Sequence, residues 1–126
     1  MKQFSMICLM AMFAVVAMAQ KPVITFEETS HNFGTIAEDG GKVSHVFNFT
    51  NTGDATLVIS NVRASCGCTT PSWPKEPVEP GKTASITVTY NPLGRPGAFT
   101  KTVTITANTE PEATMVKITG EVQKAQ

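Results

Sequence analysis

The sequence has few of the side chains from which catalytic centres and nucleic-acid interfaces are usually built. It contains only two histidines and three cysteines, and ten basic residues balance ten acidic ones over 126 positions. Because the charge is near zero and no basic cluster occurs, nucleic acid is not an expected partner. No serine lies in a G-x-S-x-G elbow and no histidine shows zinc-protease spacing, so we find no catalytic constellation and do not predict an enzyme.

Long apolar runs are also missing, apart from one near the start. The segment from Phe4 to Val16 is mostly apolar but too short for a comfortable membrane span, and no stop-transfer pattern follows it. Lys2 precedes it and Ala17-Met18-Ala19 follows it, which gives the basic, apolar and cleavage regions of a signal peptide. We predict that residues 1–19 are removed and that residues 20–126 are exported to the periplasm or the cell surface, without a membrane span.

A further absence is helical periodicity, and strand periodicity takes its place. Phe99, Val103 and Ile105 alternate with threonines, as in a strand with one buried face. Shorter alternating runs occur within residues 24–36, 46–49, 57–62, 86–90 and 116–122. Turn-forming residues separate the runs, and those at 51–54 are typical of a tight hairpin. The pattern predicts a single all-β domain over residues 20–126, an immunoglobulin-like antiparallel β-sandwich of about seven strands with its core in 23–122, or alternatively a small closed barrel.

Four stretches of the sequence carry a more specific signal. They are His31-Asn32-Phe33-Gly34-Thr35-Ile36, Phe47-Asn48-Phe49-Thr50-Asn51-Thr52-Gly53, Ser65-Cys66-Gly67-Cys68-Thr69 and Pro80-Gly81-Lys82. With these stretches the chain resembles the family catalogued as domain of unknown function 1573, over roughly residues 23–122. The resemblance implies a bacterial exported sandwich domain of immunoglobulin type with a Cys-Gly-Cys-Thr motif, and it implies no activity.

Cys66 and Cys68 are the only cysteines left once Cys8 is removed with the signal peptide. In an extended backbone they project to the same side, with their Cα atoms about 6–7 Å apart. Disulfides prefer about 5.5–6 Å, so a bridge needs a bend, which Gly67 could supply. Such a bridge would be strained and readily reduced, and it would add little stability because it closes a very short loop.

Three interpretations of the Cys66–Cys68 pair stay open. The sulfurs could be packing atoms or an inert bridge where a strand ends. They could be a reversible dithiol, although no helix N-terminus is expected there to activate a thiol. They could also bind Cu(I) or form part of a zinc site, with His31 and His45 as further ligands if the fold brings them near. Only Met115 remains after cleavage, so the methionine clustering of many copper carriers is missing.

The histidines and the single tryptophan also have structural explanations. We expect His45 to be a half-buried, hydrogen-bonded residue on an inward strand face, and His31 to bond the backbone of the turn that follows it. Glu27 and Glu28 are predicted to be solvated surface charges. Prolines around Trp73 predict an irregular loop or edge, where Trp73 either covers one end of the core or anchors a partner.

Two functions of different classes therefore follow from the sequence. The first is a non-catalytic exported module without a cofactor, which binds other proteins in the bacterial cell envelope. It would use a sheet edge or a surface near the cysteines that includes Trp73, Thr69 and Thr70. The alternative is a thiol-based redox or copper-handling periplasmic protein that uses Cys66 and Cys68.

Overall fold

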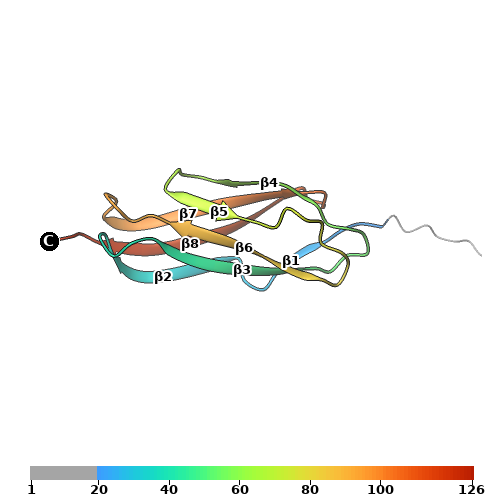
Figure 1. Cartoon of the computed structure of the whole chain (residues 1–126), viewed down its shortest axis with the longest axis horizontal. Helices are drawn as coiled ribbons and strands as arrows, with labels where there is room; N and C mark the ends of the chain where they lie inside the picture. The colour runs from blue at the N-terminus through green and yellow to red at the C-terminus, as the bar shows by residue number, and fades with distance from the viewer. Residues whose placement is uncertain (1–19) are drawn as a thin grey trace, which may run out of the picture.

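The computed structural model describes residues 20–126, which form eight strands and no helix. The predicted signal peptide, residues 1–19, lies outside the described residues. The strands are β1 (Ile24–Phe26), β2 (Ser30–Ala37), β3 (Val43–Asn51), β4 (Ile59–Ala64), β5 (Thr69–Ser72), β6 (Thr83–Tyr90), β7 (Gly97–Ala107) and β8 (Ala113–Gln123). They are stacked in two layers (Figure 1).

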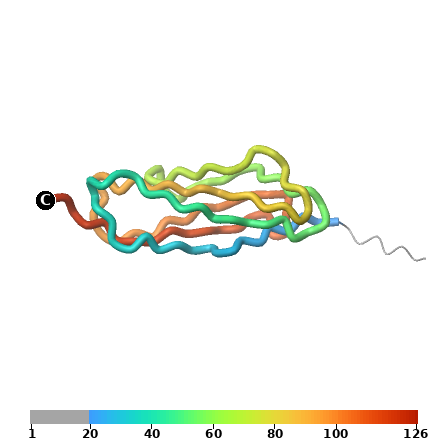
Figure 2. Tube along the Cα trace, turned by 60° about the horizontal axis from the view of Figure 1, so that its bottom comes forward, coloured from blue at the N-terminus to red at the C-terminus, as the bar shows by residue number. Residues whose placement is uncertain are grey.

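Each layer is a four-stranded sheet. The first sheet has the order β1-β3-β6-β5, and the second has the order β2-β8-β7-β4. The strands of both sheets run along the long axis of the molecule, and the two sheets lie face to face (Figures 1 and 2). The predicted β-sandwich is therefore confirmed.

Two details differ from the expected antiparallel seven-stranded arrangement. Strands β2 and β8 pair in parallel. The chain passes from β1 to β2 without turning back, as the tube in Figure 2 shows. Strand β2 therefore runs in the same direction as β8. The eighth strand is β5, which forms the edge of the first sheet where we predicted an irregular loop or edge.

The residues that alternate in the sequence point between the sheets and form the core. Eight side chains of the central strands are at most 1% exposed and form the middle of the core. They are Phe47, Phe49, Ile86 and Val88 from the first sheet, and Val103, Ile105, Val116 and Ile118 from the second. Tyr90 of β6 and Phe99 of β7 stack across the two sheets, with ring centroids 4.1 Å apart. Aromatic contacts of this kind add to the free energy of burial.

Gly120 makes room for the Phe99 ring. It lies opposite Phe99 in the β7–β8 ladder. A Cβ atom at this position would come within 2.7 Å of the ring and within 3.0 Å of the Gly34 carbonyl oxygen. The close approach of ring and backbone therefore requires glycine in this strand.

We expect Gly120→Ala to lower the free energy of unfolding by about 1–3 kcal/mol, because the ring or the backbone must move to admit the methyl group. Gly67→Ala is the matched control, since no heavy atom lies within 4 Å of its added Cβ. Urea denaturation of both variants measures the difference. Equal stability of the two variants would show that Phe99 moves aside without cost.

The connection between β3 and β4 is held by the side chain of Asn51. The predicted hairpin at residues 51–54 is wrong, because β3 and β4 belong to different sheets. Asn51 is 0% exposed, and its Oδ1 accepts hydrogen bonds from the backbone N–H of Val23 and of Gly53 at 3.3 and 3.0 Å. Its Nδ2 donates to the carbonyls of Ala55 and Val78 at 2.8 and 2.9 Å. One amide therefore satisfies backbone groups of three separate segments.

Replacing Asn51 by Ala should remove at least about 3 kcal/mol of stability, because several buried backbone groups lose their partners together. Asn48→Ala on the same strand is the control, since Asn48 is exposed. The urea midpoint should fall for the first variant and stay nearly constant for the second, with little change in m-value. A midpoint shift of equal size in both would rule out the proposed role of the amide.

Candidate functional site

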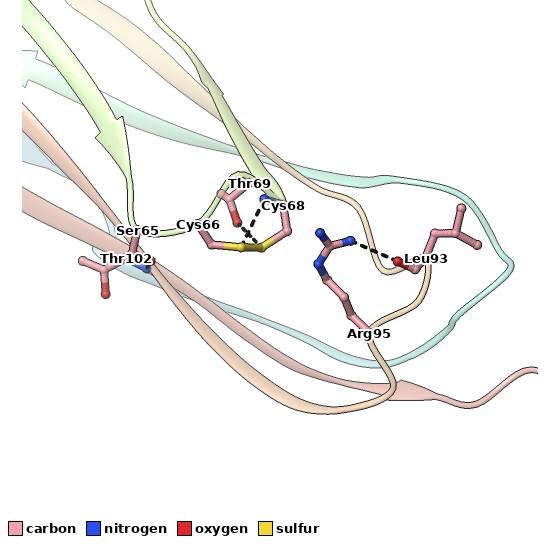
Figure 3. The surroundings of a disulfide bond; sticks show 7 residues. All are labelled: Ser65, Cys66, Cys68, Thr69, Leu93, Arg95 and Thr102. Atoms are coloured by element: carbon pink, nitrogen blue, oxygen red, sulfur yellow. Dashed lines mark hydrogen bonds between the residues drawn. A yellow bond between two sulfur atoms is a disulfide. The ribbon is translucent and has the colours of Figure 1, made fainter.

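The cysteines lie in the short turn between β4 and β5, where they form a disulfide (Figure 3). Their sulfurs are 2.03 Å apart and their Cα atoms 5.2 Å apart. The backbone closes the turn, because the Thr69 N–H donates to the Cys66 carbonyl at 3.1 Å. Gly67 is not among the glycines with positive φ, so the bend does not use the left-handed conformation that only glycine adopts easily.

The two sulfur-bearing residues differ in their exposure. Cys68 is 4% exposed and belongs to the core, whereas Cys66 is half-buried against it. Beside the disulfide lies the β6–β7 connection, from which Arg95 reaches toward the sulfurs while its Nη1 donates to the Leu93 carbonyl at 3.0 Å (Figure 3). Leu93 itself is 64% exposed. One end of the sandwich thus presents the disulfide, a cation and an apolar side chain together.

In the bonded state the two sulfurs are not thiolates, and it is the thiolate that binds metals and attacks disulfides. Metal binding by Cys66 and Cys68 would first require reduction of the bond. Neither Cys66 nor Cys68 lies with the histidines that we considered as further ligands, since His31 and His45 cluster with Glu28 instead.

The predicted surface near the cysteines is only partly exposed. Trp73 packs against the core, and the Lys75 ammonium lies 3.3 Å from the centre of its ring. This cation–π contact occupies one ring face. Thr69 is 4% exposed, so of the two threonines only Thr70 is open to solvent. Trp73 is therefore partly buried against the core, and its use as an anchor for a partner stays a prediction.

The two histidines meet near the β1–β3 side of the sandwich, away from the edge that β5 forms. His31 of β2 and His45 of β3 stack with ring centroids 3.6 Å apart and planes 6° apart. Each imidazole also stands nearly perpendicular to the ring of the phenylalanine two residues further along its own strand, with ring centroids 4.7 Å apart for His31 and Phe33 and 4.8 Å apart for His45 and Phe47. The contact joins the two sheets at a place where β2 pairs only with β8.

Glu28 completes this cluster, and sequence reasoning missed it. Its carboxylate accepts a hydrogen bond from His45 Nε2, with which it forms an ion pair when the imidazole is protonated. The predicted surface exposure of Glu28 is confirmed, since its side chain is 48% exposed, but the contact with His45 was not expected. Glu28 lies in the crossing from β1 to β2, so its place beside His45 depends on which sheets the two strands join, which no local pattern reveals.

His31 also differs from expectation. The turn that follows it is bonded by Asn32, whose Oδ1 accepts from the Gly34 N–H at 2.8 Å, and not by the histidine. Burial lowers the pKa of His31 below its ordinary value, the neighbouring His45 lowers it further, and Glu28 acts in the opposite direction. This environment favours the neutral imidazole.

The sheet edges differ in whether they can accept another strand. In β5, Pro71 has no N–H to donate, which blunts that edge. Strand β4 contains no proline. The Ser65 N–H donates to Thr102 of β7 at 2.9 Å, so by alternation the N–H and C=O groups of Val62 and Ala64 point away from β7. Strand β4 is therefore an unblocked edge.

A shallow depression runs along this edge on the outer face of the second sheet. Its volume is about 390 Å³, and its lining residues are Asn61, Arg63, Ala64, Ser65, Thr102, Thr104 and Thr106. Apart from Ala64 these side chains are polar, and Arg63 supplies a positive charge. The depression leads directly to the disulfide turn, because β4 ends at Ala64 and Cys66 follows two residues later.

Comparison with known proteins gives one family. The family model described as "Protein of unknown function (DUF1573)" matches residues 24–122. A comparison with curated protein sequences gives no match. None of the described residues belongs to a helix with the length and apolar character needed to cross a membrane.

Solved structures share the fold at low sequence identity. A protein of unknown function from Porphyromonas gingivalis W83 is 17% identical, with a TM-score of 0.71 over 86% of this chain and 50% of that one. The secreted serine protease VesC from Vibrio cholerae is 13% identical, with a TM-score of 0.59 over 79% of this chain and 23% of that one. The chaperone–tip adhesion subunit pre-assembly complex CsuC–CsuE from Acinetobacter baumannii gives 10% identity and a TM-score of 0.57, over 82% and 52%. This chain thus spans half or less of the first two structures.

The unequal burial of the two cysteines predicts an asymmetric response to substitution. We compare the double variants C66A/C68S and C66S/C68A, which have the same composition and lack the disulfide. The first should be less stable by about 1–2 kcal/mol, because it puts the hydroxyl at the buried position. Urea denaturation measures the difference, and equal stability would show that Cys68 is as accessible to water as Cys66.

Proposed function

The chain belongs to the DUF1573 family, whose description assigns no activity, and from this premise we propose that it is a non-catalytic exported module that binds other proteins in the bacterial cell envelope. The apolar leader of residues 1–19 supports export. The disulfide is in keeping with an oxidising compartment.

The observation that carries the proposal is the unblocked edge of β4. Its outward N–H and C=O groups, at Val62 and Ala64, can pair with an extended segment of a partner, which would become a fifth strand of the second sheet. Backbone pairing gives such complexes their affinity, and pockets for alternate side chains give them their specificity. The depression lies on the outer face over β4 and β7, next to the edge at which an added strand would pair.

The chemistry of the depression selects the partner segment. Its lining is polar, and Arg63 is exposed. A carboxylate on the added strand would therefore be favoured, since guanidinium–carboxylate hydrogen bonds are among the strongest in proteins. We infer that the partner supplies an extended, uncharged or acidic segment.

The other edges are less suited to strand addition. Strand β1 has only three residues, β5 carries Pro71, and β2 is interrupted by a register shift between Asn32 and Thr35. Short strands, prolines and bulges are the features by which natural sheets discourage further pairing. Strand β4 also has a register shift, between Ile59 and Asn61, but the residues from Asn61 to Ala64 pair with β7 in unbroken register. This unbroken run without proline makes β4 the favoured surface.

The similar structures support this kind of role. Several are bacterial chaperones, and one of these was solved in a pre-assembly complex with a tip adhesion subunit. At such low identity the likeness extends to the fold alone, so the partner of that chaperone is not assigned to this chain. A sandwich of this fold can nevertheless serve to bind a protein.

The alternative, thiol redox chemistry or copper handling through Cys66 and Cys68, gains no comparable support. The pair is bonded, and Cys68 is 4% exposed. The histidines lie with Glu28 and not with the sulfurs. We therefore do not propose it as the function.

Site-specific photo-crosslinking in the native bacterium tests the proposal. With benzoylphenylalanine at Asn61, beside the β4 edge, we expect a discrete adduct in the envelope fraction. The same probe at Met115, which is 61% exposed on β8 of the same sheet, should give none. Retention of the chain in the cytoplasm with its leader uncleaved would contradict the export part of the proposal.

Two variants test whether strand addition is the mode of binding. Ala64→Pro removes an outward N–H and should abolish the adduct, and Arg63→Glu should weaken it at least about fivefold by reversing the charge. Lys117→Glu is the matched charge reversal on β8 and should leave it unchanged. Circular dichroism verifies that each variant is folded. An adduct unaffected by a folded Ala64→Pro variant and by Arg63→Glu would overturn binding at β4.

A further inference from the structure

The cluster of Glu28, His31 and His45 brings three metal-binding side chains together. One ligand atom from each lies within 4.8 Å of the others. The three residues come from the β1–β2 crossing, from β2 in the second sheet and from β3 in the first. We propose that this cluster is a binding site for a divalent transition-metal ion of the zinc class.

The donor set fits such an ion. Zinc binds imidazole nitrogen and carboxylate oxygen, usually in tetrahedral geometry, at about 2.0–2.2 Å. Two nitrogens on one tetrahedral ion are then roughly 3.3 Å apart, and the ligand atoms of the cluster already lie within 4.8 Å of one another. Because the rings are nearly parallel and the nitrogen lone pairs lie in the ring planes, the rings must rotate out of their stacked arrangement for both nitrogens to face a shared ion.

The surroundings already restrict the two rings. Phe33 and Phe47 each meet one imidazole nearly edge-on, at interplanar angles of 83° and 81°. These contacts limit where each ring can turn, which reduces the entropy lost on binding. The Glu28 carboxylate already contacts one of the rings.

Charge and access also favour a dication. Two neutral imidazoles and one carboxylate carry a net charge of −1, and the side chains of His45 and Glu28 are 21% and 48% exposed. Solvent can therefore reach the cluster and fill the remaining coordination positions. Magnesium prefers oxygen ligands and is expected to bind poorly to this set.

Binding would link the sheets at a place where no strand pairing does so. Strand β2 pairs only with β8, and β3 pairs only with β1 and β6. An ion held by His31 and His45 would connect the two sheets directly. Since it would bind the folded state and not the unfolded chain, it should raise the melting temperature.

Titration of the purified chain with its disulfide intact tests the proposal, with Zn²⁺ as the probe and Mg²⁺ as the comparison ion. Calorimetry should show one Zn²⁺ per chain, and the melting temperature should rise with Zn²⁺ but not with Mg²⁺. Glu28→Gln, His31→Gln and His45→Gln should each weaken binding about tenfold or more, by analogy with losses at known metal sites. Glu27→Gln, which removes the adjacent exposed carboxylate, should leave it unchanged.

Nitrogen-15 NMR of the imidazoles gives a readout that does not depend on variants. The chain has only two histidines, so the signals of both rings should shift on addition of Zn²⁺. The proposal is overturned if Zn²⁺ does not bind, if the histidine signals do not respond to it, or if the affinity is the same in Glu27→Gln as in the three ligand variants. These outcomes are independent of whether β4 binds a partner.

Discussion

Burial of the two apolar sheet faces against each other is the interaction on which the rest of the molecule depends. To bury these faces the chain crosses from one sheet to the other between β1 and β2, β2 and β3, β3 and β4, β4 and β5, and β6 and β7. At these crossings the backbone leaves the hydrogen-bonded ladder of its sheet, and several polar side chains and the disulfide lie there. Glu28, Asn51, the disulfide and Arg95 all lie at crossings.

The strands in which apolar and polar residues alternate strongly could be predicted from the sequence, because one face of each strand is buried and the other is exposed to solvent. Residues 97–107 and 83–90 are examples, and the inward position of His45 followed from the same pattern. The partners of each strand could not be predicted this way. The hairpin at Asn51 was wrong because its turn residues resemble those of a hairpin, whereas the buried amide holds a crossing instead.

In the candidate sites, too, the features set by local sequence could be predicted, whereas those set by strand pairing could not. Cys66 and Cys68 were recognisable as a pair because their spacing is local. The approach of His31 to His45, and of Glu28 to both, depends on the parallel placement of β2 beside β8 and on the side of the sandwich at which β2 faces β3. Thr69 looked like a surface residue in the sequence, but pairing with β6 turns its side chain inward.

The chain enters the sandwich at one end of its long axis and leaves at the other (Figures 1 and 2). A polypeptide joined to each end would therefore be kept apart by the full length of the domain. The edge of β4 runs along the same axis, so a strand added there would lie parallel or antiparallel to the line between the two attachment points. Tension along that line would load such a strand in shear, with its hydrogen bonds sharing the force, instead of peeling them apart one at a time.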